Sequence, residues 1–336
     1  MPIWEMNKLS RIKLVSLLIA ALFISACSES EPPVEIESDG PPLIPVILQT
    51  DWYAQPEHAG FYQAQELGFY EEAGFDVTIR PGANMTNVPQ MVATKRVQFA
   101  VGTSDNLLMA VSRGIPLAAV FPYFQHDPQC VMVHKESGIT DLKQLDGKTV
   151  MIGPGTGYVQ YMQKTLGIRL QIVPLDYSLT RFLANKAFIQ QCFLTNEPFY
   201  AQKNGVNAHT IPLSTSGFDP YRLIYTNGDY AKDNPELVEK FVEATRRGWE
   251  DYANGDGAAA HAAIAALNSQ HTDESMNWSK NAMTQHKLIA GDEEKGEFLG
   301  RFDRQRIERM ISQLGELDML DGTIDVDKAF PLGFAD

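Results

Sequence analysis

Side chains suited to binding a small molecule are concentrated in one stretch of the chain, between Asp51 and Phe75. Trp52, His58 and Tyr62 stand in the turn and the helical segment that follow an apolar run. A strand that leads through a turn into a helix brings side chains and helix N-terminal amides to one point, where ligands bind in α/β folds. A tryptophan there could stack on a flat ring and contribute roughly 0.5–1.5 kcal/mol beyond area burial. We predict ligand contacts at these three residues; the alternatives are that Trp52 covers the core and that His58 caps the helix.

Further candidates follow later predicted strands. Ser104 and Asp105 begin a helix, and their hydroxyl and carboxylate suit the polar edge of a ligand. A carboxylate facing the ligand would disfavour a doubly charged anion. Tyr123 lies at a predicted hinge, and Glu197 could accept hydrogen bonds from an amino group, as on an aminopyrimidine. For these residues helix capping and structural contacts at the hinge are the alternatives.

The glycine-rich loop 153–158 could hold an anion with its backbone amides at the start of a helix. It lacks the Gly-Lys-Ser/Thr ending of a nucleotide P-loop, so ATP is not the expected ligand. A tight strand-to-helix turn is the alternative interpretation. The complete set of predicted ligand contacts is Trp52, His58, Tyr62, Ser104, Asp105, Tyr123, Thr156, Tyr158, Asn196 and Glu197.

The sequence contains no HExxH, GxSxG or zinc-type Cys/His pattern. We therefore predict no catalytic residue, no metal and no cofactor. Cys130 and Cys192 could form a disulfide in an exported protein, provided that their Cα atoms lie within about 7 Å. The spacing of this single pair is no metal signature, and we favour structural or free thiols.

The N-terminus has the pattern of an export signal. Three basic residues precede an apolar run that is too short to span a bilayer, which predicts a signal peptide over residues 1–26. The run ends in Ile24-Ser25-Ala26-Cys27, which resembles a bacterial lipoprotein cleavage box, so we predict lipidation of Cys27. An ordinary signal peptide with an incidental cysteine is the alternative. Residues 27–42, rich in acids and prolines, are predicted to be a disordered tether.

The net charge of −14 argues against binding to nucleic acid or to an anionic membrane surface. It does not exclude an anionic ligand, because a buried site creates its own local field. We expect a protein of the bacterial cell envelope, periplasmic or extracytoplasmic, attached to a membrane by its lipid.

Strands and helices alternate along the chain, which predicts an α/β protein with two mainly parallel sheets flanked by helices. The expected strands are 43–49, 76–80, 97–101, 117–121, 130–134, 149–152, 171–173, 188–194 and 210–212, and the expected helices are 59–67, 87–94, 104–113, 158–166, 180–185, 257–268, 274–290, 303–314 and one starting at Pro235. The pattern restarts near residue 128. We predict a bilobal binding protein with lobe one in residues 43–122 and 223–336, where the last part is helical, and lobe two in residues 128–218.

Several motifs occur in the order typical of one family. They are Trp52, Pro56, His58, Gly60, Tyr62, Ala64, Glu66, Gly68, Phe69-Tyr70 and Gly74; then Gln98-Phe99-Ala100-Val101-Gly102, Arg113-Gly114-Ile115-Pro116, the segment 139–148, Asn196-Glu197-Pro198, and Asn234-Pro235-Glu236-Leu237-Val238. This order resembles the substrate-binding proteins of ABC importers, in the branch that includes thiamine-pyrimidine precursor binders and their nitrate, sulfonate and taurine relatives. The resemblance implies a type II periplasmic-binding fold. It also implies a small-molecule ligand and a permease and ATPase as partners; we expect a monomer.

The same superfamily includes pyrimidine synthases that use pyridoxal phosphate bound to a lysine. This chain departs from them, because Thr103-Ser104-Asp105 follows the strand that ends at Gly102, with no lysine for a Schiff base and no cysteine cluster. We therefore predict binding without catalysis. The expected ligand is a flat heterocycle such as a thiamine pyrimidine precursor; a sulfonate, taurine or nitrate-type anion, a synthase-like enzyme and a non-transport envelope sensor are the alternatives.

Overall fold

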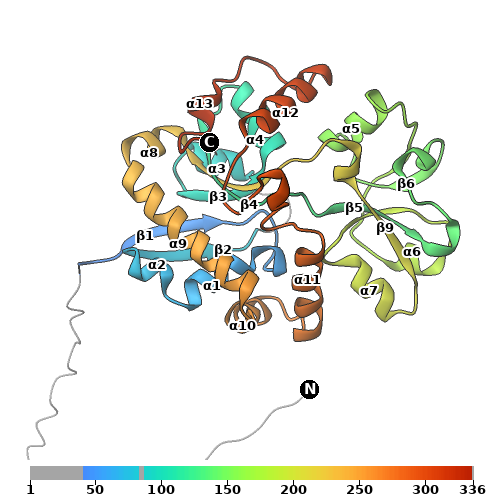
Figure 1. Ribbon diagram of the computed structural model, residues 1–336, viewed down its shortest axis with the longest axis horizontal. Coiled ribbons are helices and arrows are strands. Elements are labelled where there is room, and N and C mark those ends of the chain that lie inside the picture. The colour runs from blue at the N-terminus through green and yellow to red at the C-terminus, as the bar shows by residue number, and fades with distance from the viewer. Residues whose placement is uncertain (1–40, 83–86, 335–336) are drawn as a thin grey trace, which may run out of the picture. The chain divides into compact units, whose positions relative to one another are not determined.

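The strands of the protein form two separate five-stranded sheets, in a computed structural model that describes residues 41–82 and 87–334 (Figure 1). In the first sheet the strand order is β2-β1-β3-β10-β4, and in the second it is β7-β6-β8-β5-β9. The first sheet contains β1 (Ile44–Gln49), β2 (Phe75–Arg80), β3 (Phe99–Thr103), β4 (Leu117–Phe124) and β10 (Arg222–Asn227). The second contains β5 (Gln129–His134), β6 (Thr149–Met151), β7 (Gln171–Val173), β8 (Gln190–Phe193) and β9 (Ala208–Pro212).

Both sheets are mixed, whereas the sequence predicts mainly parallel ones. In the first sheet β1 pairs in parallel with β2 and β3, but β10 is antiparallel to both β3 and β4. In the second sheet β6 is parallel to β7 and β8, but β5 is antiparallel to β8 and β9. The α/β class with two helix-flanked sheets is confirmed, and the mixed character arises because the chain passes from one sheet to the other and back.

Strand β10 is the main element missing from the sequence prediction, which expects no strand between residue 212 and the helix starting at Pro235. All six residues of β10 are buried, and the strand lies in the sheet between β3 and β4. The first sheet is therefore completed by a segment that follows the whole of the second sheet in the sequence. The chain passes between the sheets at residues 125–128 and 213–221, which we call the first and second crossings.

The helices cover both faces of the sheets. The helices are α1 (Ala59–Glu66), α2 (Phe69–Glu72), α3 (Val88–Ala93), α4 (Ser104–Ser112), α5 (Gly157–Lys164), α6 (Thr180–Ala184), α7 (Glu197–Lys203), α8 (Gly228–Asp233), α9 (Pro235–Asn254), α10 (Ala258–Leu267), α11 (Asp273–Gln285), α12 (Arg304–Glu316) and α13 (Val326–Ala329). Short 3₁₀ turns are η1 (Pro56–His58), η2 (Lys135–Ser137), η3 (Leu142–Leu145), η4 (Leu213–Ser216) and η5 (Glu293–Lys295). Most predicted helices are confirmed to within a few residues.

Two buried apolar clusters lie on the two faces, and strand residues alternate between them. Val46 and Leu48 belong to one cluster, while Ile47 packs against the other. In the second sheet Cys130 and Met132 belong to the first cluster and Val131 and Val133 to the second, as a side-chain period of two requires. Burial on both faces explains why these strands read as continuous apolar runs.

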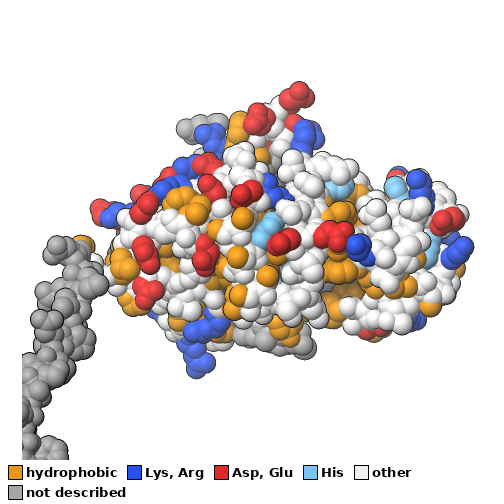
Figure 2. Space-filling view, turned by 90° about the horizontal axis from the view of Figure 1, so that it is seen from below, with side chains coloured by type: hydrophobic (Ala, Val, Ile, Leu, Met, Phe, Trp, Pro, Cys, Tyr) orange, Lys and Arg blue, Asp and Glu red, His pale blue; other side chains and the backbone are white. Residues whose placement is uncertain are grey.

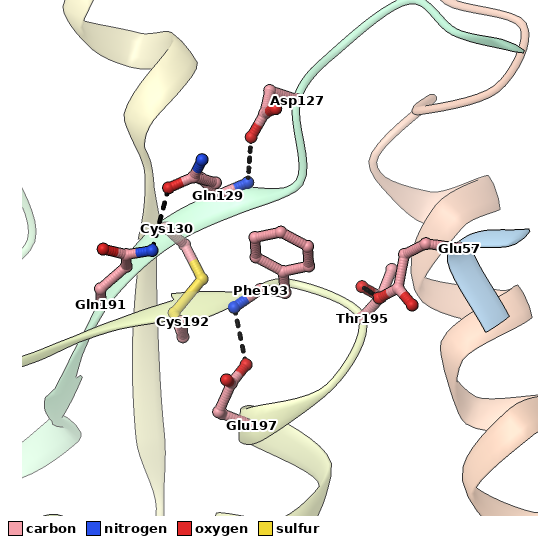
Figure 3. Close-up of a disulfide and its surroundings, with 9 residues drawn as sticks. All are labelled: Glu57, Asp127, Gln129, Cys130, Gln191, Cys192, Phe193, Thr195 and Glu197. Carbon is pink, nitrogen blue, oxygen red and sulfur yellow. Dashed lines mark hydrogen bonds between the residues drawn. A yellow bond between two sulfur atoms is a disulfide. The ribbon is translucent and has the colours of Figure 1, made fainter. Parts of the chain in front are cut away.

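Cys130 and Cys192 form a disulfide, which corrects the preference for structural or free thiols. The two residues are direct register partners of the antiparallel strands β5 and β8, and their Cα atoms are 5.0 Å apart (Figure 3). Cross-strand pairing places the two residues side by side, and this pairing could not be inferred from a sequence separation of 62 residues.

The predicted signal peptide, Cys27 and residues 27–40 of the predicted tether lie outside the described residues. Residues 42–336 form one compact unit. Across residues 41–82 and 87–334, no helix combines the length and the apolar character needed to span a bilayer. On the face drawn in Figure 2, acidic and basic side chains are interspersed rather than gathered by sign.

Helices α1 and α9 approach each other closely because glycines stand at their contact. A Cβ on Gly248 would lie 2.5 Å from the Cβ and 2.8 Å from the backbone nitrogen of Ala64. A Cβ on Gly60 would overlap the indole ring of Trp249, which is fully buried. Gly60, which belongs to the segment richest in candidate ligand contacts, thus fixes the distance between the two helices.

We expect Gly248→Ala to lower the free energy of unfolding by about 1–3 kcal/mol, because the added methyl group cannot be accommodated without moving a helix. Gly315→Ala is the matched control, since it lies in α12 and its Cβ would meet no atom within 4 Å. That substitution is expected to be neutral or to stabilise by up to about 1 kcal/mol through helix propensity. Urea unfolding measures both values, and equal stability of the two variants would contradict the close approach.

Candidate functional site

Arg222, the first residue of β10, lies at the centre of a buried ionic cluster between the sheets. Its Nε donates a hydrogen bond to the hydroxyl oxygen of Tyr123 over 2.9 Å, and one terminal nitrogen forms an ion pair with Asp51. The other terminal nitrogen is 3.8 Å from Asp127 Oδ2. The guanidinium carbon also lies 5.7 Å from the ring centre of Phe193 in the second sheet. One cation thus connects the end of β1, β4, the first crossing and β8.

Asp51 and His58 form the next part of this cluster. His58 Nε2 is 3.1 Å from Asp51 Oδ1, and the imidazole has no solvent exposure. Burial by itself raises the pKa of the Asp51 carboxyl, but Arg222 and His58 outweigh burial and hold that pKa well below its usual range. Asp51 is therefore ionised, and His58 orients it from the interior.

A small cavity lies beside this cluster and is walled by both sheets and both crossings. Its volume is about 70 Å³, well below the roughly 300–1,000 Å³ typical of ligand pockets. A ligand larger than a small functional group therefore requires the two walls to separate. The lining residues come from β3 and α4, the first crossing and β5, the start of α5, and the second crossing: Thr103, Asp105, Asn106, Asp127, Gln129, Thr156, Gly157, Tyr158, Leu213, Ser214, Phe218 and Pro220.

Three of the predicted ligand contacts meet in this cavity, namely Asp105, Thr156 and Tyr158. Tyr158 donates a hydrogen bond to Gln191 Oε1 over 2.7 Å, and the amide of Gly153 donates to the same oxygen over 2.9 Å. The glycine-rich loop therefore already uses its first amide internally, while Thr156, Gly157 and Tyr158 line the cavity.

Trp52 stands apart, in contact with an aromatic residue that the sequence analysis did not select. The rings of Trp52 and Tyr177 have centroids 5.1 Å apart, with Trp52 after β1 and Tyr177 after β7. Tyr177 is 70% exposed and has a φ of 59°, a left-handed conformation that is uncommon for a large side chain. Non-glycine residues held in this way are often found where ligands are clamped.

The remaining predicted contacts lie in the core or at the starts of helices. Tyr62 and Tyr123 are buried in the core, where burial raises the pKa of Tyr62 to about 12. Ser104 Oγ accepts the amide hydrogen of Tyr221, which holds the second crossing against α4. Asn196 lies at the N-cap of α7, and Glu197 turns back to accept the Phe193 amide hydrogen over 2.7 Å (Figure 3).

A buried contact also joins the two sheets near Glu57. The Glu57 carboxylate accepts a hydrogen bond from the hydroxyl of Thr195, which follows β8 (Figure 3). The Thr195 carbonyl in turn accepts from Ser279 of α11 over 2.5 Å. Both Glu57 and Thr195 are about 1% exposed, so this contact is shielded from water.

The important residues missing from the sequence prediction are Asp127, Gln129, Tyr177 and Arg222. Arg222 begins an apolar run, Leu223 to Tyr225, and a charge at that position could have marked the end of a buried strand. Asp127 lies between the two predicted lobes and carries no further sequence signal. Tyr177 is a single aromatic in a polar loop and carries no sequence signal.

The solved structures that resemble this protein define its class. The periplasmic aliphatic sulphonate binding protein of Escherichia coli superposes with a TM-score of 0.66 at 10% identity, covering 87% of this chain and 92% of the other. The periplasmic nitrate-binding protein of Synechocystis PCC 6803 gives a TM-score of 0.62 at 13% identity, covering 85% and 84%. The protein has the fold of the periplasmic binding proteins.

Within this class the chain belongs to the NMT1/THI5 like family, which it matches over residues 55–259. A formylaminopyrimidine-binding protein of Halalkalibacterium halodurans is 22% identical over 330 residues, covering 95% of this chain and 97% of the relative. A thiamine biosynthesis protein of Haemophilus influenzae is 29% identical over 40% of this chain, and the aligned part spans 45% of that relative. A 4-amino-5-hydroxymethyl-2-methylpyrimidine phosphate synthase of Saccharomyces cerevisiae is 26% identical, covering 64% and 68%.

We expect Arg222→Gln to cost about 3–5 kcal/mol of unfolding free energy, because it removes the cation from the buried Asp127 and the half-buried Asp51. Arg113→Gln is the matched control. Its partner Asp321 is exposed, so the loss is expected to stay below about 1 kcal/mol. Denaturant unfolding compares the variants, and a cost for Arg222→Gln no larger than the control would refute the central role of this cluster.

A pH-dependent stability is expected from Asp127. Burial, with smaller contributions from the neighbouring Asp105 and Asp219, raises the pKa of Asp127 to about 7, although Arg222 and the Gln129 amide oppose the rise. Because the folded pKa exceeds the unfolded value near 3.9, the contribution of Asp127 to stability is complete below about pH 4 and is lost as the pH rises through 7.

Asp127→Asn removes this dependence. The stability of the variant minus that of the wild type is expected to increase between pH 4 and 7, by at most about 1.4 kcal/mol per pH unit. Urea unfolding of both proteins at several pH values measures this difference. A difference that is constant with pH would show that the Asp127 carboxyl is not perturbed in the folded protein.

Proposed function

We propose that this protein is the solute-binding component of an ABC importer. The observation that carries the proposal is a cavity whose walls come from the loops of both sheets and from both crossings. In a binding protein with two lobes, a ligand can be enclosed in such a cavity when the lobes close by bending at the crossings. Membership of a family that contains a formylaminopyrimidine-binding protein supports the same role.

We further propose that the two sheets are the cores of two lobes, with lobe one in residues 43–122 and 223–336 and lobe two in 128–218. The first crossing and the second crossing would form the hinge. At this hinge His126 is 2.6 Å from Asp219 and 3.0 Å from Glu297, so that side-chain contacts connect both crossings with the C-terminal segment. A permease would recognise the closed form, which the ligand makes more populated.

The proposed ligand is a flat amino-heterocycle such as a thiamine pyrimidine precursor. Trp52 and Tyr177 supply an aromatic pair contributed by both sheets, and stacking on a flat ring suits such a pair. The buried carboxylates of the cavity suit a ligand that donates hydrogen bonds. The pyrimidine-related names of several family members support this ligand class.

Location and assembly remain part of this proposal. The solved neighbours are named as periplasmic binding proteins, which supports an extracytoplasmic location. We propose that the mature protein is a monomer anchored by a lipid at Cys27, and that a permease and an ATPase are its partners.

Three alternative functions, an anion binder, a synthase and an envelope sensor, can be distinguished from the proposed one. An anion binder is disfavoured by carboxylates in the cavity, although two neighbours in fold are named for sulphonate and nitrate. Synthase activity is the alternative that the yeast relative raises. A pyridoxal absorbance band after purification, or turnover of a bound pyrimidine, would support that alternative. The absence of permease and ATPase genes near the gene for this protein would favour an envelope sensor.

We expect 4-amino-5-hydroxymethyl-2-methylpyrimidine or its formylamino relative to raise the melting temperature of the purified protein, while nitrate and ethanesulfonate do not. Trp52→Ala and Tyr177→Ala are each expected to weaken binding of the pyrimidine about 3- to 10-fold through loss of stacking. Calorimetry provides the affinities, and native mass spectrometry of freshly purified protein reveals any ligand that copurifies.

Tyr53→Ala is the control for these variants, because Tyr53 is an exposed neighbour whose ring meets Trp52 edge-on at 5.5 Å, within the same segment. It is expected to leave the affinity nearly unchanged. Stabilisation by ethanesulfonate or nitrate but not by the pyrimidines would overturn the proposed ligand class.

A further inference from the structure

Two carboxylates in the cavity have oxygens without hydrogen-bond donors. Asp105 Oδ1 and Asp127 Oδ2 are buried and accept no hydrogen bond from the described part of the chain. Asp105 and Asp127 are each only 6% exposed. Burying an ionised carboxylate without a partner is costly, so buried acceptors of this kind are normally satisfied by a cation or by N–H donors.

The two carboxylates reach the cavity from separate elements. Asp105 is the second residue of α4, directly after β3, and Asp127 lies in the first crossing. Asp127 Oδ1 accepts the Gln129 amide hydrogen over 2.9 Å, which orients its other oxygen. Because each position is fixed by a different part of the backbone, the pair is built into the fold rather than formed by one acidic loop.

The opposite wall of the cavity comes close to Asp105 only because it contains a glycine. A Cβ on Gly157, the first residue of α5, would lie 3.1 Å from Asp105 Oδ2 and 2.7 Å from the Phe218 ring. The helix start of the second sheet is thus shaped to approach the carboxylate of the first. A ligand group held by Asp105 would be in reach of both walls.

The local charge is unbalanced toward the negative. Among the described residues, Arg222 is the cation in this cluster, and it already pairs with Asp51 and Tyr123. Its contact with Asp127 is long, at 3.8 Å. Burial raises the pKa of Asp105 and that of Asp127, which is the response expected of carboxyl groups that lack a full counter-charge.

We propose that the cavity is a subsite for one nitrogen group of the ligand, an aromatic amino group or an amidinium, which donates one N–H to Asp105 and another to Asp127. This inference rests on the proposed function, because it assigns part of a ligand to the inter-sheet site. The volume of about 70 Å³ is small beside the roughly 300–1,000 Å³ of whole-ligand pockets, so the cavity is proposed to hold this one group of the ligand. The same carboxylates repel sulfonate and nitrate groups.

The test compares ligands with and without the nitrogen group, using the full-length protein purified in detergent. Calorimetry measures the affinity of 4-amino-5-hydroxymethyl-2-methylpyrimidine and of its analogue with hydrogen in place of the amino group. Losing charge-assisted hydrogen bonds is expected to weaken binding of the analogue to the wild type about 10- to 100-fold. In Asp105→Asn and in Asp127→Asn this preference is expected to fall to about 3-fold or less.

A second measurement does not depend on a pyrimidine ligand. Acetamidinium chloride is expected to raise the melting temperature of the wild type more than tetramethylammonium chloride at equal ionic strength, because only acetamidinium has N–H donors. Asp105→Asn is expected to abolish this difference. Asp233→Asn, an exposed carboxylate on α8, is the control and is expected to keep it. If one cavity variant fails to fold, as judged by circular dichroism, the other decides.

The possible outcomes distinguish an error in the proposed subsite from an error in the proposed function. If the wild type binds the aminopyrimidine and both Asn variants retain the full preference for the amino group, the subsite is wrong and the proposed function stands. If no pyrimidine binds but acetamidinium stabilises the protein through Asp105, the proposed ligand is wrong and the subsite stands. If neither probe binds, or if ethanesulfonate binds more tightly than both, the two proposals fall together.

Discussion

The arrangement of the two sheets depends on one buried guanidinium. Arg222 carries the positive charge that stabilises the buried Asp127 and the half-buried Asp51, where the ends of strands converge between the sheets. Charged groups are retained in a protein interior when each finds a counter-charge and hydrogen-bond partners. Because the partners of Arg222 come from β1, β4 and the first crossing, their positions are coupled to one another.

The two apolar clusters determine where this polar centre can lie. Each cluster covers one face and includes side chains from both sheets, so the faces are closed by helices and the ends of the strands remain for polar residues. The polar side chains gather where the loops of the two sheets meet, at the cavity and around Glu57. Ligands of α/β proteins bind at the ends of the strands for the same reason, because helices cover the faces of the sheet and leave its strand ends open.

Much of the fold follows from local patterns in the sequence, because apolar periodicity and capping residues act over short distances. Helix α9 begins at Pro235 after Asn234 as its sequence predicts, and the strands around Val46 and Val131 lie where apolar runs predict them. The position of β10 could not be read in this way, since its identity as a strand depends on β3 and β4, which lie about a hundred residues earlier in the sequence. The disulfide depends equally on the register of β5 and β8.

The candidate site was predictable in part. Asp105, Thr156 and Tyr158 were accessible from sequence because strand ends and glycine-rich turns mark the edge of a sheet. The ligand contacts predicted at Tyr62 and Tyr123 stay predictions from pattern alone. Both residues are buried, because a tyrosine at a strand end or in a first helical turn can face the core as readily as a ligand. Tyr177 and Arg222 can be recognised as site residues only from the tertiary structure, in which the second sheet lies beside the first.

The late position of β10 in the sequence has a consequence for the order of folding. The second sheet is built from one continuous segment, residues 129–212, so its strands can pair as soon as that segment is available. The first sheet must wait for Arg222–Asn227 before β3 and β4 gain their shared neighbour. Pairings between distant segments are slow because chain entropy is lost before contacts form. Until that strand is inserted, the facing edges of β3 and β4 remain open to pairing with other chains.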